Sequence, residues 1–535
     1  MVHTALKAFI HLSSLILPLA LTTALSTPSC RFANQWTSEH ILSSSQAFED
    51  ALLFWEGKFH QHNVSYNAIN GMTFDGTLLD IATGTHRVEG LHTFSAASKE
   101  SSHLMMLAHA IEGKPGAVRW VLSGEGEHNV VDVDKAQKVA AGVLQRKWES
   151  YSQFNETFPG FGGFLPWFAH TEFNPLTPTW DWNNRVPALD NGENIWAIYA
   201  TIEALKNTGN KDYVALGSKW EGYLNYLKST AEKIFYRGSG RICAVTSIHD
   251  QTLPIDHPEQ TYTCEGLDSG GNPFINDPYE GQGFMFFLYL FGNLDQTEKA
   301  ALLELKRPQL VSADWSMPGY QNVTVQKGFW FSSHENWGWM QLPYIDIPFM
   351  KDLYTNMERA RTCDSQAKKL PGMFASINNS TDQNGEIIGY ISNAGIPQIA
   401  NQTVQELDVI TPYSTMNTMM VNKTVGFLWW HNMATAKRMQ NLYGSSESTR
   451  IDGTATSAFV SWDSKITTVN GILGGVLSLV RSGMQRDGIY DEFIKVVNDE
   501  YRLVFDESLG DTSQDFCLPD VKVGDLGLAD FTTCS

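Results

Sequence analysis

Several polar stretches of the sequence place carboxylates and aromatic side chains directly before apolar, helix-like runs. One of them reads TWDWNNRVPALDNGENIWAIYA and another FWFSSHENWGWMQLPYID. The carboxylates and the histidine of these stretches are Asp190, Glu193, Glu280, His334, Glu335, Asp408 and Asp463. Aromatic rings stack on the apolar faces of sugar rings, and carboxylates accept hydrogen bonds from sugar hydroxyls. The stretches therefore predict a cleft that binds carbohydrate.

Two of these carboxylates have surroundings that suit proton transfer at a glycosidic bond. That reaction needs one carboxyl group to deliver a proton and a second one to activate water or attack directly. Glu280 precedes the apolar run GQGFMFFLYLF, and burial among apolar groups raises the pKa of a carboxyl group, which suits the acid. Asp463 lies between Ser461 and Ser464 at the start of a helix-like run, where the helix dipole favours the ionised form that a base needs.

A purely structural role is the alternative for each of these residues. Asp is strongly favoured as an N-cap, and both Asp190 and Asp463 precede helix-like runs in that way. Glu is a poorer N-cap, which favours a functional role for Glu280. His334 stands next to Glu335, but no second His or Cys follows at ligand spacing, so we expect neither a metal nor another cofactor. The sequence also lacks a nucleophile elbow, a phosphate-binding loop and a dinucleotide fingerprint.

Helical periodicity recurs along the chain, whereas strand-like runs such as VRWVLSG are few. Apolar residues recur at three-to-four spacing in SSHLMMLAHAIEG, VDKAQKVAAGVLQRKWESYSQF, NGENIWAIYATIEALKN, KWEGYLNYLKSTAEKIF, EKAALLELK, ATAKRMQNLYG and DSKITTVNGILGGVLSLVRSG. The run KWEGYLNYLKSTAEKIF has charges on one side and is typical of an outer helix, whereas EGQGFMFFLYLFG and ITTVNGILGGVLSLV lack a charged face. The two kinds together predict an all-α-dominated fold, a double-layered helical toroid whose inner helices begin around one cavity.

Composition and the N-terminal segment narrow the class of protein. The 535 residues carry a formal net charge of −20, which argues against a nucleic-acid partner and against binding to an anionic membrane. Residues 1–26 combine a weakly basic start, an apolar run and small residues, which predicts a secretory signal too short to span a bilayer. No linker or shift in composition follows, so we expect residues 27–535 to form a single domain of a secreted, extracellular monomer.

Sequons and cysteines agree with export. Sequons occur at Asn63, Asn155, Asn322, Asn378, Asn379, Asn401 and Asn422, and with the signal they predict a glycosylated eukaryotic protein. The six cysteines are widely spaced and include no CxxC pair, which predicts disulfides rather than metal sites. A Cys243–Cys264 bridge is favoured because it would close one loop, and the pairing of the other four stays open.

Several segments resemble those of a known family, in the same order. The run HTFSAASKESSHLMMLAHAIEG resembles a motif of the bacterial glycoamylase-like domain, whose family contains bacterial endo-β-1,2-glucanases. The segments ALDNGENIWAIYATIEAL, PYEGQGFMFFLYLFG, HENWGWMQLPY, ITPYSTMNTMM and YGSSESTRIDGTATSAFVSWDSKITTVNGILGG resemble later parts, and the resemblance runs from Phe74 to Gly475. Tyr279 stands where that family has Asn, and Ser464, Lys465 and Ile466 stand where it has Gln-Gly-Pro. With these differences, the signal and the sequons, the chain resembles the separate fungal endo-β-1,2-glucanase family.

The resemblance to the fungal family implies an (α/α)6 toroid and an inverting reaction on β-1,2-glucan, with Glu280 as general acid and Asp463 as general base. In that family the acid acts through a substrate hydroxyl and the base through a water chain, so the usual inverting separation of roughly 6.5–9.5 Å between carboxyl groups need not apply. The residues expected to contact substrate are Asp190, Glu193, Trp196, Tyr279, His334, Glu335, Trp337, Asp408, Thr411 and Tyr413. Glu265 in TCEG and Asp452 in RIDG form the reserve pair of carboxylates.

Three other functions stay open on the sequence. A toroid glycosidase that acts on a different β-glucan, or from a chain end, would use the same carboxylates. A secreted protein that binds wall glycans without catalysis would use them as helix caps. A polysaccharide lyase would need a group that neutralises a uronic acid, and no basic cluster stands near these stretches. The β-1,2 linkage rests on the resemblance alone.

Overall fold

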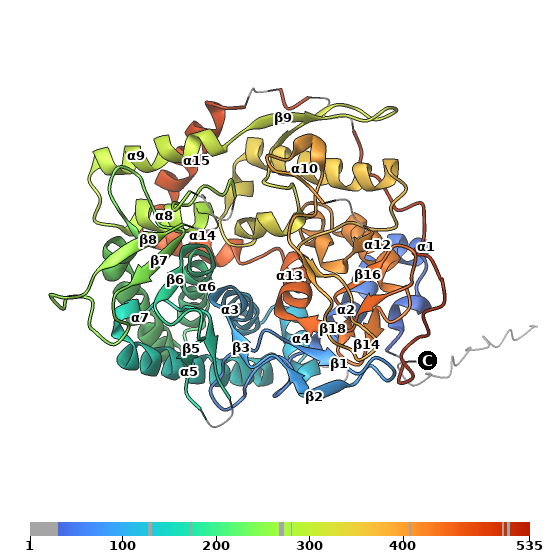
Figure 1. Cartoon of the computed structure of the whole chain (residues 1–535), viewed down its shortest axis with the longest axis horizontal. Helices are drawn as coiled ribbons and strands as arrows, with labels where there is room; N and C mark the ends of the chain where they lie inside the picture. Colours follow the sequence, from blue (N-terminus) through green and yellow to red (C-terminus); the bar gives the residue numbers. More distant parts are fainter. Residues whose placement is uncertain are drawn as a thin grey trace, which may run out of the picture.

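Helices arranged around a common centre dominate the computed structural model of this chain (Figure 1). The structure describes residues 30–126, 131–171, 174–266, 272–279, 281–405, 408–505, 508–510 and 514–534. The predicted secretory signal, residues 1–26, and the predicted acid Glu280 lie outside these ranges.

Six segments form the inner layer of the described chain. In chain order they are α3 (Ala97–Glu112), α6 (Ala188–Asn207), α8 (Gly281–Phe291), the 3-10 segment η4 (Ser333–Met340), α11 (Met416–Val421) and α13 (Trp462–Ile472). α13, α3, α6 and α8 contact each other in that order, and α11 contacts both η4 and α13. Every residue of α8 from Gly281 to Leu290 is buried, which agrees with its lack of a charged face.

Six outer helices of the described chain alternate with the inner segments along the sequence. They are α2 (Ser45–Gly57), α5 (Val133–Thr157), α7 (Lys211–Phe235), α9 (Gln296–Lys306), α10 (Pro348–Ala367) and α12 (Lys423–Ala434). α5 packs against α3, and α7 packs against α6. The alternation produces the predicted (α/α)6 toroid, and one continuous apolar cluster runs through it from Cys30 to Cys534.

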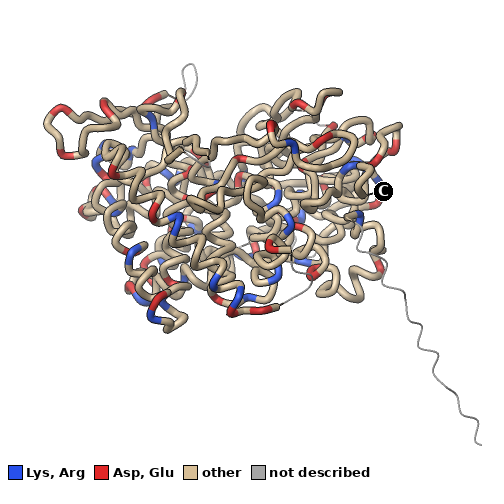
Figure 2. Tube along the Cα trace, turned by 90° about the horizontal axis from the view of Figure 1, so that it is seen from below, with Lys and Arg blue, Asp and Glu red and all other residues tan. Residues whose placement is uncertain are grey.

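The remaining helical segments fill the ends and edges of the toroid. The α-helices are α1 (Ser38–Ser43), α4 (Pro115–Gly124), α14 (Leu477–Arg486) and α15 (Tyr490–Arg502). The 3-10 segments are η1 (Phe32–Gln35), η2 (Pro159–Phe161), η3 (Arg307–Gln309), η5 (Tyr344–Asp346), η6 (Pro397–Ile399) and η7 (Pro412–Thr415). Figure 2 shows basic residues dispersed among acidic ones along the described trace, and many of them pair, as Arg307 does with Glu500.

Short antiparallel strands form sheets of two or three members in the described chain. The strands are β1 (Gly76–Leu79), β2 (His86–Leu91), β3 (Phe94–Ser95), β4 (Phe168–Ala169), β5 (Thr177–Pro178), β6 (Arg185–Pro187), β7 (Val245–Ile248), β8 (Tyr262–Glu265), β9 (Ser312–Trp315), β10 (Val323–Gln326), β11 (Ile377–Asn378), β12 (Tyr390–Ile391), β13 (Val409–Ile410), β14 (Gln440–Asn441), β15 (Gly444–Ser445), β16 (Ser448–Arg450), β17 (Thr456–Ser457) and β18 (Phe459–Ser461). The sheets are β18-β1-β2, β3-β4-β5, β6-β7-β8, β9-β10, β11-β12, β13-β16-β17 and β14-β15. β3, β6 and β18 lead directly into α3, α6 and α13, so these sheets fix where the inner helices begin.

Three local predictions from the sequence are wrong. The strand-like run VRWVLSG lies in α4, which Pro115 opens at its first position. The run ATAKRMQNLYG is not a helix, because α12 ends at Ala434 and Arg438 adopts a φ of 58°, which an α-helix cannot contain. The run DSKITTVNGILGGVLSLVRSG is two helices rather than one, because Gly474 and Gly475 have φ values of 77° and 60° between α13 and α14.

Three disulfides join the six cysteines. The predicted Cys243–Cys264 bridge is confirmed, and it links the segment before β7 to β8. The pairs that the sequence left open are Cys30–Cys534 and Cys363–Cys517. The first of these bridges ties the two ends of the described chain together. Within the described ranges, no helix combines the length and the apolar character that a membrane crossing requires.

Candidate active site

Three inner helices begin at one end of the toroid, and each has an ionisable residue in its first turn. Asp190 is the third residue of α6, Lys99 is the third residue of α3, and Asp463 is the second residue of α13. α3 contacts both α6 and α13, so the three first turns adjoin. The N-cap alternative for the two aspartates is wrong, because the cap positions are Pro187 for α6 and Ser461 for α13.

A fourth ionisable residue, Asp75, reaches the same place through the pairing of β1 with β18. The register sets Gly76 opposite Ser461, and the Trp462 N–H donates to the carbonyl of Asp75 over 3.3 Å. The Asp75 carboxylate contacts His92 Nδ1 at 3.1 Å. Burial opposes the charge of Asp75, but His92 and Lys99 together hold its pKa below the usual range.

The ammonium group of Lys99 lies at the centre of these acids. Its Nζ is 3.1 Å from Asp463 Oδ2 and 3.7 Å from Asp75 Oδ1, and only 9% of the side chain is exposed. The nitrogen also lies 5.5 Å from the ring centroid of Trp167. Burial alone would lower the pKa of Lys99, but the carboxylates of Asp463, Asp75 and Asp190 raise it above its usual value. Lys99 is therefore a permanent cation in this site.

The two carboxylate oxygens of Asp463 differ in their contacts. Its Oδ2 faces Lys99, whereas its buried Oδ1 has no hydrogen-bond partner among the described residues. The side chain keeps 28% of its surface accessible, yet protein surrounds it closely enough that burial raises its pKa. Lys99 opposes that rise and Asp75 adds to it. Burial thus outweighs the helix start that the sequence analysis expected to favour the ionised form.

The side chain of Asp190 lies next to a group of stacked aromatic rings. Trp167 Nε1 donates a 3.2 Å hydrogen bond to Asp190 Oδ2. Burial raises the pKa of Asp190, and Lys99 opposes that rise. The ring of Trp167 lies nearly parallel to Phe94 and to Trp182, at centroid distances of 6.0 and 6.1 Å. Aromatic side chains therefore adjoin the carboxylates, as the sequence predicted for this stretch.

Glu447 is a further carboxyl group of the site, and sequence analysis missed it. It is buried in the segment before β16, and its side chain accepts a 2.7 Å hydrogen bond from Asn378 Nδ2. Burial is the main cause that raises the pKa of Glu447 to about 8; the hydrogen bond from Asn378 opposes the rise, and the nearby Asp463 and Asp75 contribute to it. Glu447 is therefore protonated at neutral pH.

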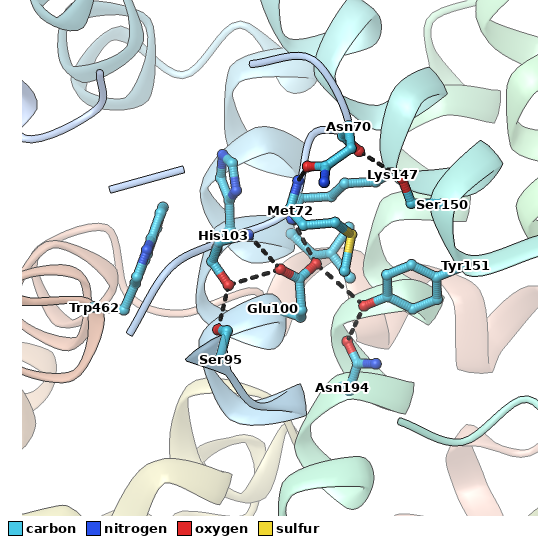
Figure 3. Close-up of polar contacts among 12 residues, drawn as sticks. Asn70, Met72, Ser95, Glu100, His103, Lys147, Ser150, Tyr151, Asn194 and Trp462 are labelled. Atoms are coloured by element: carbon cyan, nitrogen blue, oxygen red, sulfur yellow. Dashed lines mark hydrogen bonds and ion pairs between the residues drawn. The ribbon is translucent and has the colours of Figure 1, made fainter. Parts of the chain in front are cut away.

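A buried network behind the site holds the first turn of α3 in place (Figure 3). Glu100, the neighbour of Lys99, accepts hydrogen bonds from the Thr73 N–H at 2.8 Å and from the Thr73 hydroxyl at 2.7 Å. Lys147 from α5 lies 2.5 Å from the other carboxylate oxygen, and Tyr151 donates to that oxygen at 3.3 Å. Glu100 is thus fully engaged with structural partners, which anchors the helix turn that carries Lys99.

His334 and Glu335, both expected to contact substrate, lie in η4 beside a pocket. The pocket is lined by Leu189, Ala244, Ile275, Asn276, Asp277, Phe329, Trp330, His334 and Glu335. Burial lowers the pKa of His334 to about 3, and the ring contacts the Ser376 hydroxyl. Burial raises the pKa of Glu335 to about 8, and its carboxyl group accepts the N–H groups of Trp330 and Ser332 in a capping box. Both therefore shape η4 as well as the pocket.

Six further residues expected to contact substrate are buried. Trp196 donates to the carbonyl of Gly283 over 2.8 Å, and Tyr279 donates to the carbonyl of Gln326 over 2.6 Å. Thr411 donates to the carbonyl of Glu447 over 2.6 Å, which ties it to the site. Glu193, Trp337 and Tyr413 are also buried, and Tyr413 donates to the carbonyl of Ser376.

Three carboxylates of the sequence analysis have partners elsewhere. Asp408 forms an ion pair with Arg450. The reserve residue Glu265 pairs with Arg185, and the reserve residue Asp452 accepts the hydroxyl of Thr454 in a turn of its own. Glu280 lies outside the described residues. The structure thus brings together Asp190 and Asp463 from the predicted set, and adds Lys99, Asp75 and Glu447.

This arrangement suits proton transfer at a sugar. Carboxyl groups in both protonation states lie around one buried cation, next to aromatic rings, at the starts of inner helices. Among the described residues, no set of three His, Cys, Asp or Glu side chains is arranged to hold a metal ion. The helical toroid and this site define a glycoside hydrolase.

Residues 72–535 match the family described as Endo-beta-1,2-glucanase SGL, and the chain belongs to that family. Among solved structures, the endo-beta-1,2-glucanase from Talaromyces funiculosus is 52% identical, with a TM-score of 0.91, and the match covers 95% of this chain and 100% of that one. It has been solved with sophorose and, as a glutamate-to-glutamine mutant, with beta-1,2-glucan.

The bacterial relatives share the fold. The endo-beta-1,2-glucanase from Chitinophaga pinensis, solved with sophorotriose and glucose, is 12% identical, with a TM-score of 0.54 over 83% of this chain and 98% of that one. No curated protein matches the sequence. The predicted family and the predicted toroid are confirmed, and membership of a hydrolase family argues against the lyase and the non-catalytic alternative.

Proposed function

We propose that the protein is an endo-β-1,2-glucanase that hydrolyses linear β-1,2-glucan to short β-1,2-linked oligosaccharides, sophorose and longer. The observation that carries this proposal is the 52% identity, over the full length of the relative, to an enzyme solved with both sophorose and beta-1,2-glucan. At that similarity the cleft of this chain is expected to accept the same glucan.

The proposed reaction inverts the anomeric centre, with Glu280 as general acid and Asp463 as general base. Support for Asp463 comes from its position among the carboxylates of the site, with Oδ1 free to accept a proton while Oδ2 faces Lys99. Support for Glu280 comes from the sequence alone, because it precedes the buried helix α8 in the matched segment PYEGQGFMFFLYLFG. The acid would act through a substrate hydroxyl and the base through a chain of water molecules.

The proposal includes export and glycosylation. The apolar N-terminal segment and the sequons support a secreted glycoprotein, and three disulfides suit an oxidising compartment. The protein is proposed to act as a monomer on a soluble or wall-bound polysaccharide, without a nucleic-acid or membrane partner.

Digestion of linear β-1,2-glucan by the purified secreted protein tests the function. Proton NMR during the first turnovers is expected to show short β-1,2-linked oligomers released as the α-anomer. Linear β-1,3- and β-1,4-glucans serve as matched substrates and should stay intact. Cleavage of one of these polymers, with β-1,2-glucan untouched, would refute the linkage, and release of sophorose alone from the first turnover would indicate action from a chain end.

Two substitutions test the roles. Glu280→Gln and Asp463→Asn keep the size of each side chain and remove its proton chemistry, so each is expected to lower kcat by a factor of at least about 10² while the melting temperature stays near that of the wild type. Near-normal turnover by either variant would remove that residue from its role. Glu265→Gln, a substitution in the reserve pair, is the control and should keep its activity.

A further inference from the structure

Lys99 is a buried cation in a position where helix electrostatics disfavour it. It belongs to the first turn of α3, where the helix dipole repels positive charge, and burial adds a second cost. Sequences break local rules of this kind mainly at functional sites. The matching anions are not on α3, since the next residue, Glu100, is engaged by Thr73, Lys147 and Tyr151.

The ammonium group serves two carboxylates from different parts of the chain. It lies 3.1 Å from Asp463 Oδ2 on α13 and 3.7 Å from Asp75 Oδ1 before β1. His92 holds the other oxygen of Asp75 at 3.1 Å, so this aspartate is an anion fixed from both sides. Lys99 contacts Oδ2 of Asp463. Oδ1 of Asp463 therefore stays without a hydrogen-bond partner among the described residues.

We propose that Lys99 is a positioning residue for the hydrolysis: it keeps Asp463 ionised and oriented so that Oδ1 is the atom that accepts the proton. The inference rests on the proposed function, in which Asp463 is the general base. Asp75 weakens this effect, because it shares the ammonium group of Lys99 with Asp463. The pair of Lys99 and Asp75 thus sets the proton affinity of the base.

Other ionisable groups also face Asp463 and Lys99. From the elements packed around them these groups are Asp75 and His92 near β1 and β2, Asp190 on α6, Glu447 before β16 and Tyr390 on β12. Asp190 and the ionised form of Glu447 repel a charge on Asp463, and burial already raises the pKa of Asp463. The positive charge of Lys99 opposes these contributions and favours the ionised form of Asp463.

Two substitutions with opposite expected effects test the inference. Lys99→Met keeps most of the side-chain volume and removes the charge, so the acid limb of the pH profile of kcat/KM should move to higher pH by about one unit or more. On that limb the change is a loss of about tenfold in kcat/KM at fixed pH. Asp75→Asn releases Lys99 to Asp463 and should move the same limb to lower pH. Lys99→Arg restores the charge and should return the limb toward the wild-type position.

A structural role for Lys99 predicts a different pattern. Loss of packing would lower kcat or the melting temperature in both variants without moving the limb in opposite directions. Arg481→Met, which removes an ion pair with Asp346, is the matched control and should leave the profile unchanged. If Lys99→Met fails to fold, Lys99→Gln takes its place: movement of the acid limb to higher pH supports the inference, and an unmoved limb overturns it.

The two proposals fail in distinguishable ways. A wild-type protein that cleaves no β-1,2-glucan overturns the proposed function and this inference with it. A wild type that cleaves the polymer, combined with a folded Lys99→Met variant whose acid limb stays in place, overturns this inference alone. Substrate affinity offers an independent check, because a positioning residue that does not contact the sugar should change kcat while KM stays near its wild-type value.

Discussion

The side-chain amide of Asn378 donates a 2.7 Å hydrogen bond to the carboxyl group of Glu447 in the candidate active site. Asn378 also opens the first of two overlapping sequons, since it precedes Asn379 and Ser380. An N-linked glycan would sit on the same Nδ2 atom that this hydrogen bond uses. The glycan would replace one of the two amide hydrogens and would have to fit beside the buried Glu447, so we expect Asn378 to stay unmodified in the folded protein.

Mass spectrometry of the secreted protein is expected to find Asn378 unmodified and Asn401 glycosylated. Asn401 belongs to an exposed stretch of the chain, so a glycan there meets solvent. Peptide mapping before and after removal of N-glycans measures both sites. A folded, active preparation with a glycan on Asn378 would show that the surroundings of Glu447 accommodate the sugar and would overturn this expectation.

Replacing Glu447 by Gln should change how stability depends on pH. The pKa of Glu447 is about 8 in the folded protein, above its unfolded value of about 4.3, so the native state binds the extra proton between these values. Its stabilising contribution is therefore complete below about pH 4 and is lost as the pH rises through 8. Gln mimics the protonated form, so the advantage of Glu447→Gln over the wild type should grow from about 1 kcal/mol at pH 5 to several kcal/mol at pH 8. Urea unfolding at both pH values measures this difference, and parallel curves for the two proteins would refute it.

Much of the fold was predictable because local patterns report it. Apolar runs without a charged face became inner helices, as α8 and α13 show, and the amphipathic run from 219 to 235 lies in the outer helix α7. The prediction of helices failed where the backbone conformation of a residue differs from the one that its residue type favours. Arg438, at φ 58°, ends a helical pattern that its residue types would continue. Periodicity does not detect a single left-handed residue of this kind.

The site was predictable only in part, because its members come from distant segments. Asp190 and Asp463 stand before apolar runs, and this local signal identified them. Asp75 has no such signal, since the register of β1 against β18 brings it to α13. Lys99 did have a signal that could have found it, because a lysine in the first turn of a helix opposes the dipole. Residues that meet only through the pairing of strands cannot be identified before the fold is known.

Removing Lys147 should destabilise the protein far more than removing an exposed lysine. Lys147 and Glu100 are both fully buried, so Lys147→Met leaves a carboxylate without its counter-ion and is expected to cost about 3–5 kcal/mol. Glu100→Gln combined with Lys147→Met removes both charges and should recover part of that loss. Lys495→Met breaks an exposed pair with Asp499 and should leave the stability close to that of the wild type. Chemical denaturation of the variants compares them, and equal costs for both lysine substitutions would contradict this assignment.

Acid should destabilise the protein through a buried pair of histidines. His60 Nε2 lies 3.0 Å from His103 Nε2, and burial lowers the pKa of His60 to about 3 and that of His103 well below its usual value. The unfolded chain binds protons at both residues below about pH 6.5, whereas the native state does not, so stability falls as the pH drops below that point. Each residue contributes a slope of about 1.4 kcal/mol per pH unit when its unfolded form is fully protonated.

His103→Gln tests this slope, because the amide keeps a hydrogen-bonding partner for His60 but does not titrate. Between pH 4 and 6 the free energy of unfolding of this variant should fall less steeply with acid than that of the wild type. The two slopes should differ by up to about 1.4 kcal/mol per pH unit, the value for one proton. His40→Gln is the control, because His40 is exposed and its loss should leave the slope unchanged. Urea unfolding at half-unit pH steps gives the slopes. If His103→Gln and the wild type show the same slope, His103 takes up protons in the native state and the neutral pair does not exist.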